Sequence, residues 1–484
     1  MTAPGQAADA TLDAAFARLR DELAIRDAFP PDVLEEAERT AARVPAAGAG
    51  RADATDVPFV TVDPPGSRDL DQAVHAERDG DGWRLRYAIA DVGFWVDRGG
   101  AVEREAWLRG VTFYAPDRRE TLYPPALSEG AASLLPDAPR PAVLFDVRLD
   151  ARAEPTAWSV GRALVRSRAQ LTYAELQAGD PRIPTLGALA EIGPLRLARE
   201  AERGGVSLPA REQQVQRRAA AALGYALEFE APTDAEEWNA QVSLLTGHLA
   251  ALRMLDARVG VLRTMPRFDP RDVAKLRRVA LTLGFDWPEG TDYPDFLRRV
   301  PRDHPRLDVL VRQAQRTMRG ADYVAFDGAP PEQPLHGALA FAYAHVTAPL
   351  RRLADRYVLD LLLTLAEGAR PSPAEVATLR SLAPVMHAAG RAEGTLARRA
   401  VDVAEAWTLR GRAGDTLAAV VVDVRRAEAE VQVEDPPVRA EVSLVPRAEP
   451  PPLGARVPLR VERGDVAAGR VRLAFAGPPA AGPP

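Results

Sequence analysis

Hydrophobic residues recur at different intervals along the chain, and these intervals divide it into stretches of different structure. Residues 10–25 and 30–44 place apolar side chains at helical spacing, and the second segment begins with Pro-Pro-Asp, a favourable helix start. Between about residues 57 and 160, short β-branched and aromatic runs punctuated by Gly, Pro and Asp predict strands. From about 190 to 410, long helical patterns dominate. This separation predicts an α+β domain, a mixed sheet with surrounding helices, rather than alternating βαβ units.

The last part of the chain has a different pattern. After about residue 412, short runs of alternating apolar and polar residues are separated by turns, which is typical of a small closed β-barrel such as an OB-fold. The segment PAAGAGRADATD, residues 45–56, breaks the helical pattern and is expected to be a linker. We therefore predict a helical N-terminal module with its linker (1–56), an α+β domain (57–410), an OB-fold barrel (411–478) and a disordered tail (479–484).

Composition narrows the classes of function to consider. The 484 residues are 46% hydrophobic, enough for a sizeable core, and the net charge of -6 indicates no overall attraction to nucleic acids or anionic membranes. Cysteine is absent, which excludes disulfides, thiolate metal sites and cysteine nucleophiles. No apolar run reaches the ~18 residues of a membrane span, and no secretory signal is present, so we expect a soluble cytoplasmic protein. Lys275 is the only lysine and has no P-loop context, which argues against a nucleotide cofactor.

Three aspartates crowd the stretch TVDPPGSRDLDQAV, residues 61–74. Asp63, Asp69 and Asp71 surround turn residues that follow a strand-like run, and like charges this close resist ionising together unless a cation lies between them. Carboxylates held on a rigid edge suit Mg²⁺ or Mn²⁺. A hydrated acidic turn is the alternative, and spacing alone does not decide between the two.

A second polar cluster is YAHVTAPLRRLADRY, residues 343–357. Pro349 suits the first turn of a helix, so Arg351 and Arg352 are expected just inside a helix N-terminus, where backbone N–H groups favour an anion such as phosphate. The alternative is a solvated basic turn, in which these arginines pair with Asp355.

Aromatic and basic residues alternate in a third segment, VTFYAPDRRETLYPPALSEG, residues 111–130. Tyr114 and Tyr123 flank Arg118 and Arg119, and such interleaving suits stacking on unpaired bases, worth ~1–3 kcal/mol per base. Tyrosines beside prolines also serve as packing residues, so this segment is a weak signal when it is taken alone.

The order of these motifs, with YAIADVGFWV between the first and third, resembles the RNB domain of the ribonuclease II and ribonuclease R family over about residues 57–405. The resemblance implies a processive 3′-to-5′ exoribonuclease that acts on single-stranded RNA and releases nucleoside 5′-monophosphates with divalent metal. It also implies that a C-terminal RNA-binding barrel follows the catalytic domain. Bacterial members commonly begin with cold-shock-type barrels, whereas the first 56 residues here are too short for two barrels and look helical.

The resemblance implies a role for each residue that matches a family motif. Asp63, Asp69 and Asp71 match metal-binding aspartates, which suits a two-metal mechanism with Mg²⁺ or Mn²⁺. The family usually has another aspartate where this chain has Gln72, and glutamine can ligate a metal but adds no negative charge.

On the RNA side, Arg351 matches the arginine that engages the scissile phosphate, and Tyr114 matches the aromatic residue that stacks near the 3′-terminal nucleotides. Arg352 is expected to contact RNA, and Asp71 and Arg351 are the expected catalytic residues. We therefore expect a monomeric, metal-dependent exoribonuclease of the bacterial cytoplasm. The alternative is a catalytically weak RNA-binding or regulatory protein with a degraded metal site at Gln72.

Overall fold

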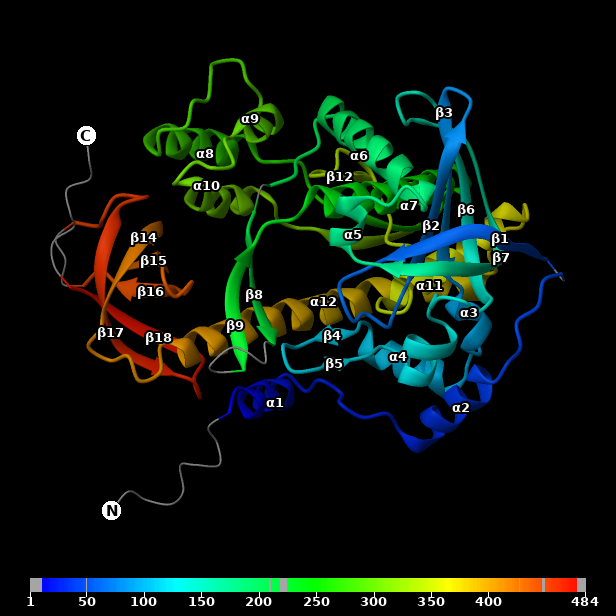
Figure 1. The fold of residues 1–484 in the computed structure, drawn as a ribbon, viewed down its shortest axis with the longest axis horizontal. Coiled ribbons are helices and arrows are strands. Elements are labelled where there is room, and N and C mark those ends of the chain that lie inside the picture. The colour runs from blue at the N-terminus through cyan, green and yellow to red at the C-terminus, as the bar shows by residue number, and fades with distance from the viewer. Residues whose placement is uncertain are drawn as a thin grey trace.

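In the computed structural model, a β-barrel and a smaller curled sheet lie at opposite ends of the molecule, and one long helix runs between them (Figure 1). This helix, α12 (Pro373–Thr408), begins beside the larger barrel and ends at the smaller sheet. The structure describes residues 11–48, 50–208, 210–217, 224–425, 427–445 and 449–476. The expected tail over 479–484 lies outside these residues.

The larger barrel confirms the predicted mixed sheet. Its strands close in the order β1-β2-β3-β6-β7, and every neighbouring pair is antiparallel except β1 and β7, which run parallel. The strands are β1 (Arg51–Val62), β2 (Gln72–Asp79), β3 (Gly82–Ala90), β6 (Arg140–Leu149) and β7 (Pro155–Leu171).

The expected linker over 45–56 is wrong in its second half, because β1 already begins at Arg51. This segment pairs with β7 from Arg51 opposite Arg162 to Ala54 opposite Val165, and that partner lies more than 100 positions away in the sequence. A strand whose order depends on so distant a partner gives little local signal.

Short elements and helices fill the space around the barrel. Between β3 and β6 lie α3 (Val92–Trp95), α4 (Ala101–Arg109), β4 (Phe113–Tyr114), β5 (Arg119–Glu120) and a π-helical turn (Leu127–Ala131). Helix α6 packs on β2, and α11 packs on β7. The barrel-side helices are α5 (Tyr173–Ala178), α6 (Pro184–Glu202), α7 (Asp234–Ala257) and α11 (Leu353–Ala366).

The stretch predicted to be mainly helical also contains three pairs of antiparallel strands. They are β8 (Glu212–Arg217) with β9 (Tyr225–Glu230), β10 (Val259–Thr264) with β11 (Asp322–Asp327), and β12 (Leu335–His336) with β13 (Phe341–Ala342). A helical insert with its own hydrophobic cluster separates β10 from β11. It comprises α8 (Pro270–Thr282), α9 (Tyr293–Arg299), α10 (Leu307–Ala314) and a 3₁₀ turn (Gln315–Thr317).

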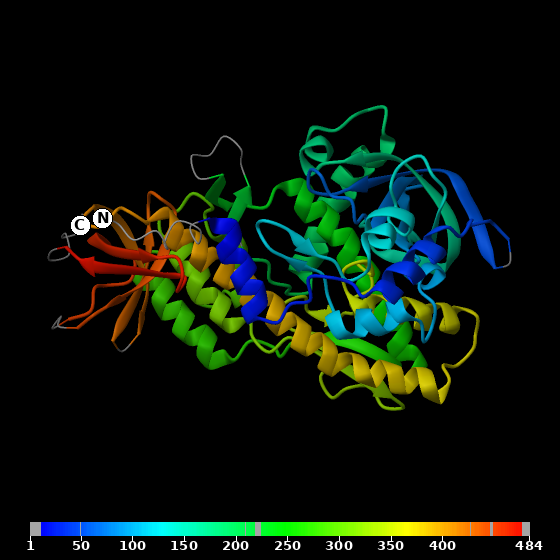
Figure 2. The same cartoon turned by 90° about the horizontal axis from the view of Figure 1, so that it is seen from below.

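The predicted N-terminal helices are present as α1 (Leu12–Glu22) and α2 (Pro31–Ala41). Phe16 is fully buried in the main hydrophobic core, so α1 shares the core of the larger domain. Helix α1 lies alongside α12 (Figure 2), and buried Arg20 pairs with Asp117 at 2.6 Å. The N-terminal segment is therefore built into the half of the molecule that contains the larger barrel.

The five C-terminal strands confirm the predicted OB-like region. They pair in the order β16-β15-β14-β17-β18, and β16 also contacts β18. Their bounds are β14 (Thr416–Arg425), β15 (Glu428–Val433), β16 (Arg439–Ser443), β17 (Arg456–Asp465) and β18 (Arg470–Phe475). None of the helices in the described part of the chain combines the length and apolar character needed to cross a bilayer.

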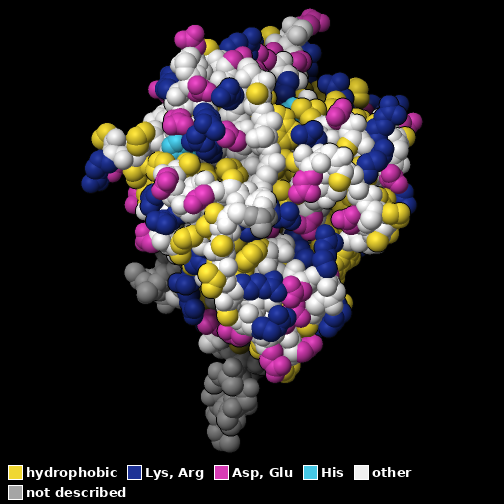
Figure 3. All heavy atoms as spheres, turned by 90° about the vertical axis from the view of Figure 1, so that its right-hand side faces the viewer, with side chains coloured by type: hydrophobic (Ala, Val, Ile, Leu, Met, Phe, Trp, Pro, Cys, Tyr) yellow, Lys and Arg dark blue, Asp and Glu magenta, His cyan; other side chains and the backbone are white. Residues whose placement is uncertain are grey.

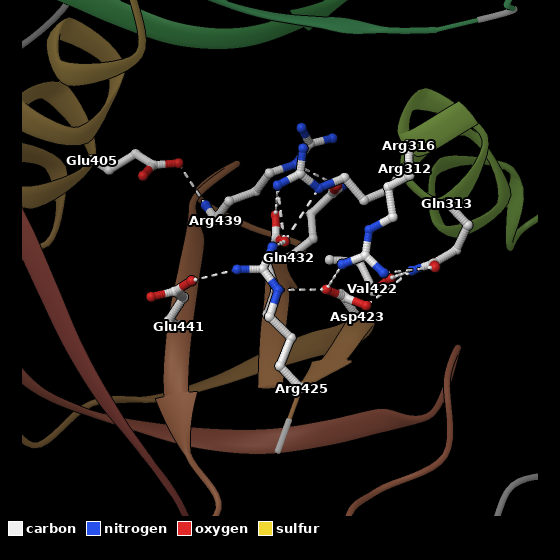
Figure 4. A network of polar contacts seen from close by, with 11 residues as sticks. Arg312, Gln313, Arg316, Glu405, Val422, Asp423, Arg425, Gln432, Arg439 and Glu441 are labelled. Atoms are coloured by element: carbon white, nitrogen blue, oxygen red, sulfur yellow. Dashed lines mark hydrogen bonds and ion pairs between the residues drawn. The ribbon is translucent and has the colours of Figure 1, made fainter. Parts of the chain in front are cut away.

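Polar contacts join this sheet to the helical insert (Figure 4). Arg312 of α10 pairs with Glu430 of β15 at 2.8 Å, and Arg316 pairs with Asp423 of β14. Gln313 donates a hydrogen bond to the Val422 carbonyl at 2.9 Å. The outward side of β14 and β15 is thus held against the helical insert.

At the end of α12, the carboxyl group of Glu405 connects this helix to β8 and β16. Buried Glu405 accepts hydrogen bonds from the Arg439 backbone N–H at 2.6 Å and from the Gln213 side chain at 2.7 Å, both at Oε1. Burial raises the pKa of Glu405 to about 8. The folded state therefore retains this proton to a higher pH than the unfolded chain does, so stability falls as pH rises from about 4.5 to about 8.

We expect Glu405→Gln to remove this loss of stability, because an amide oxygen can accept the same two hydrogen bonds without a charge to bury. Near pH 9 the variant should be more stable than the parent by roughly 2–4 kcal/mol, since each pKa unit corresponds to about 1.4 kcal/mol. Urea unfolding from pH 5 to 9 measures the effect, with exposed Glu441→Gln as the control. Parallel pH profiles for parent and Glu405→Gln would contradict it.

Candidate active site

The aspartate loop leaves the barrel at the end of β1. The Asp63 N–H donates to the Leu171 carbonyl at 2.9 Å, which holds the loop to the end of β7. Gly66 then takes a positive φ of 81°, a conformation that favours glycine, so the chain reverses here. The loop returns to the barrel at Gln72, the first residue of β2.

Residues after the π-helical turn fix the second half of this loop. The Leu70 N–H donates to Ser133 Oγ at 2.9 Å, and the Leu134 N–H donates to the Leu70 carbonyl at 3.0 Å. Ser133 Oγ in turn donates to the Arg68 carbonyl at 2.6 Å. Leu70 is fully buried, so Asp69 and Asp71 on either side of it have little freedom to move.

The aspartates differ in their surroundings. Burial raises the pKa of Asp63 to about 6, and the nearby Asp69 carboxylate adds to the effect. Burial raises the pKa of Asp71 further, to about 8, although Arg351 and a backbone N–H act in the opposite direction. Ionising these groups together is therefore unfavourable unless positive charge approaches them.

The arginine motif meets the loop at Asp71. The Leu350 N–H donates to Asp71 Oδ1 at 2.7 Å, and Arg351 Nε lies 3.4 Å from Asp71 Oδ2. Two motifs separated by almost 280 residues are thereby brought into contact. Half of the Arg351 side chain remains accessible to solvent and to substrate.

Arg352 has a different environment from its neighbour. Its guanidinium donates to Asp355 at 2.8–3.2 Å, and Asp355 also accepts the Ala348 N–H at 2.8 Å. Asp355 is fully buried, so this pair is not the solvated turn considered from sequence. The expected helix start at Pro349 is also wrong: α11 begins at Leu353, because Asp355 holds the preceding residues in a turn.

Tyr114 reaches the aspartates from the hairpin β4–β5. The Thr112 N–H donates to the Arg351 carbonyl at 3.0 Å, which places this segment beside the arginine turn. The Tyr114 hydroxyl donates to Asp69 at 2.9 Å, and the residue as a whole is 44% exposed. Burial, together with the Asp69 carboxylate, raises the pKa of Tyr114, so its hydroxyl remains a donor. Tyr123, by contrast, is fully buried and serves packing.

Arg119 is a site residue that sequence reasoning did not single out from its neighbour Arg118. Its guanidinium bridges Asp69 at 2.8 Å and Glu129 at 2.9 Å. Glu129 belongs to the π-helical turn, so Arg119 connects that turn to the aspartate loop. The alternating Tyr and Arg residues of the third motif carried this signal, but not which arginine would turn toward the aspartates.

Gln72 is tied to the backbone of the arginine motif. Its amide nitrogen donates to the Thr347 carbonyl, and the Thr347 hydroxyl contacts Ser243 at 2.8 Å. Within the described ranges, no three His, Cys, Asp or Glu side chains converge closely enough to enclose a metal ion.

A divalent cation nevertheless fits part of the expected ligand set. Mg²⁺ that acts on phosphates is usually held by one or two carboxylates, while water and substrate supply the other ligands. Asp63 and Asp69 provide two carboxylates that repel each other. Asp71 and Gln72 have atoms engaged by the 347–351 turn. The residues therefore suit one cation better than two.

A cavity of about 560 Å³ opens beside Tyr114 and Arg351. Its other walls are formed by α12 and by the paired strands β10 and β11. The sequence patterns did not connect either of these segments with the aspartate and arginine motifs. Among the described residues, five arginines and one carboxylate line it; these charged residues are Arg263, Arg351, Arg352, Arg391, Glu393 and Arg398. This basic cavity contrasts with the outer face seen in Figure 3, where acidic and basic side chains are interspersed.

Comparison with known proteins agrees with this geometry. The RNB domain model matches residues 51–368, and the model of the RNase II-type exonuclease C-terminal S1 domain matches residues 415–476. Ribonuclease R of Escherichia coli strain K12 is 32% identical over 329 residues, which are 64% of this chain and 39% of that protein. The chain thus spans about two fifths of the length of this curated relative.

Solved structures show the same fold at low sequence identity. Mycoplasma genitalium RNase R in complex with ribose methylated single-stranded RNA aligns with a TM-score of 0.83 at 18% identity, over 96% of this chain and 78% of that one. Yeast Ssd1, described as a pseudonuclease, aligns with a TM-score of 0.72 at 16% identity, over 93% and 58% of the two chains. Because the RNB match extends over residues 51–368 and so covers more than half of the sequence, the chain belongs to the RNB-domain family of ribonuclease II and ribonuclease R.

Proposed function

We propose that the protein is a 3′-to-5′ exoribonuclease that hydrolyses single-stranded RNA to nucleoside 5′-monophosphates with the help of a divalent cation. The observation that carries this proposal is that Asp71 contacts Arg351, which lines the basic cavity together with Tyr114. Family membership supports the reaction class. The solved RNase R relative was captured with single-stranded RNA, which supports the substrate class.

The side chains divide the work of phosphodiester hydrolysis between them. Water attacks the scissile phosphorus, the bond to the 3′ oxygen of the penultimate nucleotide breaks, and the terminal nucleotide leaves with the phosphate on its 5′ oxygen. Arg351 neutralises the charge that develops on the phosphate oxygens. Asp63 and Asp69 hold the divalent cation, which supplies Lewis-acid stabilisation when it is bound. Tyr114 offers its exposed ring to a terminal base.

A single gel tests the reaction. Uniformly labelled RNA, and a uniformly labelled hairpin with a 3′ overhang, are incubated with Mg²⁺ in the presence and absence of a chelator. We expect stepwise shortening from the 3′ end and release of mononucleotides only without chelator. Internal fragments would indicate an endonuclease, and an intact but shifted band would indicate a binding protein.

Tyr114 should influence where degradation stops. We expect Tyr114→Ala to weaken the hold on the last nucleotides, by ~1–3 kcal/mol for one lost stacking contact, and to lengthen the limit product. Tyr114→Phe keeps the ring but loses the 2.9 Å hydrogen bond to Asp69, so its limit product should match that of the parent. Sequencing gels resolve the end products, and an unchanged ladder for Tyr114→Ala would contradict the stacking role.

Gln72 supports the second candidate, a catalytically weak RNA-binding protein, because its amide is committed to Thr347 and adds no charge to the aspartate loop. The fold alone does not guarantee catalysis, as the pseudonuclease Ssd1 illustrates. The two-metal mechanism expected from the resemblance remains a prediction that this position can test.

We expect Gln72→Asp to lower the Mg²⁺ concentration needed for half-maximal hydrolysis several-fold, since it adds a negative charge directly after Asp71, at the start of β2. The variant also leaves the Thr347 carbonyl without its donor, at a cost of about 1 kcal/mol in stability. Metal titrations of the initial rate compare the variant with the parent. Superimposable titrations would place position 72 outside the metal site.

A further inference from the structure

The wall of the basic cavity formed by α12 has an unusual surface. Counted from His387, the residues Gly390, Arg391, Gly394 and Arg398 lie three, four, seven and eleven positions further along, so all five share one face of the helix. Glycine inside a helix is destabilising relative to alanine. A Cβ placed on Gly390 would meet nothing within 4 Å, so packing does not demand glycine there. These glycines instead keep the floor of the cavity clear.

The arginines around this floor differ from most others in the molecule. In the part of the chain that the structure describes, no carboxylate lies within ion-pair distance of Arg263, Arg391 or Arg398. Arg263 lies over the Tyr323 ring at 4.7 Å, and Arg398 contacts the Thr395 hydroxyl at 3.3 Å. Asp402, four positions along from Arg398, acts on that arginine electrostatically without forming an ion pair, so the three guanidiniums can still donate to a ligand.

The positive charge exceeds what one scissile phosphate requires. Arg351 already serves that phosphate in the proposed reaction, and Arg352 is neutralised by Asp355. Glu393 is the one carboxylate that the described ranges contribute to the lining, and burial raises its pKa. A 3′-hydroxyl end would bring no charge of its own to the three remaining guanidiniums. A terminal phosphate monoester carries about 1.5 to 2 negative charges at neutral pH and three strong acceptor oxygens.

We propose that this cavity receives RNA ends that carry a 3′-phosphate, which Arg263, Arg391 and Arg398 recognise. The inference rests on the proposed exoribonuclease function and specifies its substrate. Hydrolysis of such an end transfers water to the scissile phosphorus and breaks the bond to the penultimate 3′ oxygen, as for any other end. The first product is then a nucleoside 3′,5′-bisphosphate, and every later product is a 5′-monophosphate.

Two RNAs of identical sequence, one ending in a 3′-hydroxyl and one in a 3′-phosphate, test this inference. Binding is measured by fluorescence anisotropy with chelator present, so that it does not depend on catalysis. The first cleavage is measured with Mg²⁺, and its product is identified by chromatography. We expect the 3′-phosphate RNA to bind about tenfold more tightly, which corresponds to about 1.4 kcal/mol, and to release the bisphosphate first.

Arg391→Gln should reduce binding and cleavage of the 3′-phosphate RNA about tenfold more than those of the 3′-hydroxyl RNA. Gly390→Leu should have a similar effect by filling the floor. The matched control is Arg380→Gln on the same helix, because Arg380 pairs with Asp327 outside the cavity. Equal affinity for both RNAs, a block at the 3′-phosphate end, or equal losses on both RNAs in Arg391→Gln would overturn the inference. Failure to degrade either RNA would instead count against the proposed function, while the binding comparison still decides the inference.

Discussion

Replacing Arg351 with methionine is expected to slow RNA hydrolysis by about 10²- to 10³-fold, the usual cost of removing one group that stabilises transition-state charge. Methionine retains much of the apolar stem, and the side chain is half exposed, so the fold should tolerate the change. Arg351→Lys keeps the charge but loses the forked geometry, and we expect an intermediate rate. Single-turnover cleavage of labelled RNA measures the effect.

The control for this experiment is Arg380→Met, which removes an exposed arginine of α12 that pairs with Asp327 outside the cavity. RNA affinity should fall only modestly in Arg351→Met, because Tyr114 remains exposed and able to stack on a base. A hydrolysis rate within threefold of the parent would remove Arg351 from the catalytic role.

Local sequence patterns predicted the major elements and the order of the motifs. The helical periodicity of residues 10–25 and 30–44 is present as α1 and α2, and the alternation after residue 412 is present as the curled C-terminal sheet. Errors arose where a partner distant in sequence decides the structure. The strand from Arg51 needs β7, and β10 pairs with β11 across the helical insert of about 60 residues.

The candidate site shows the same limit. Asp63, Asp69 and Asp71 share one loop and were visible as a motif, and family resemblance linked them to Arg351. Spacing alone could not indicate that Arg352, rather than Arg351, would pair with a buried Asp355. The sequence did not predict the cavity wall on α12. Arginines and glycines on one face of a helix indicate a cavity only when the segments opposite them, here β10 and β11, are known.

Asp71→Asn should have the largest effect of any single substitution, with hydrolysis reduced by ~10³-fold or more while RNA binding is largely retained. Asparagine preserves the acceptor for the Leu350 N–H, now 2.7 Å from Asp71, but it cannot ionise and so cannot present a negative charge to a cation or to Arg351, whose Nε lies 3.4 Å away. Arg351 then loses the partner that orients it toward the phosphate, and the aspartate loop loses one charge that attracts a cation.

Stability should change in the opposite direction, and this separates a catalytic defect from unfolding. Because burial raises the pKa of Asp71 to about 8, its ionised form is disfavoured in the folded chain, and its contribution to stability falls as pH rises from about 4 to 8. Asparagine carries no such cost, so Asp71→Asn should unfold at an equal or higher urea concentration than the parent at pH 8. An inactive variant of undiminished stability implies that the buried carboxylate is retained for chemistry at the expense of stability. An active variant, or an inactive one that is clearly less stable, would contradict this role.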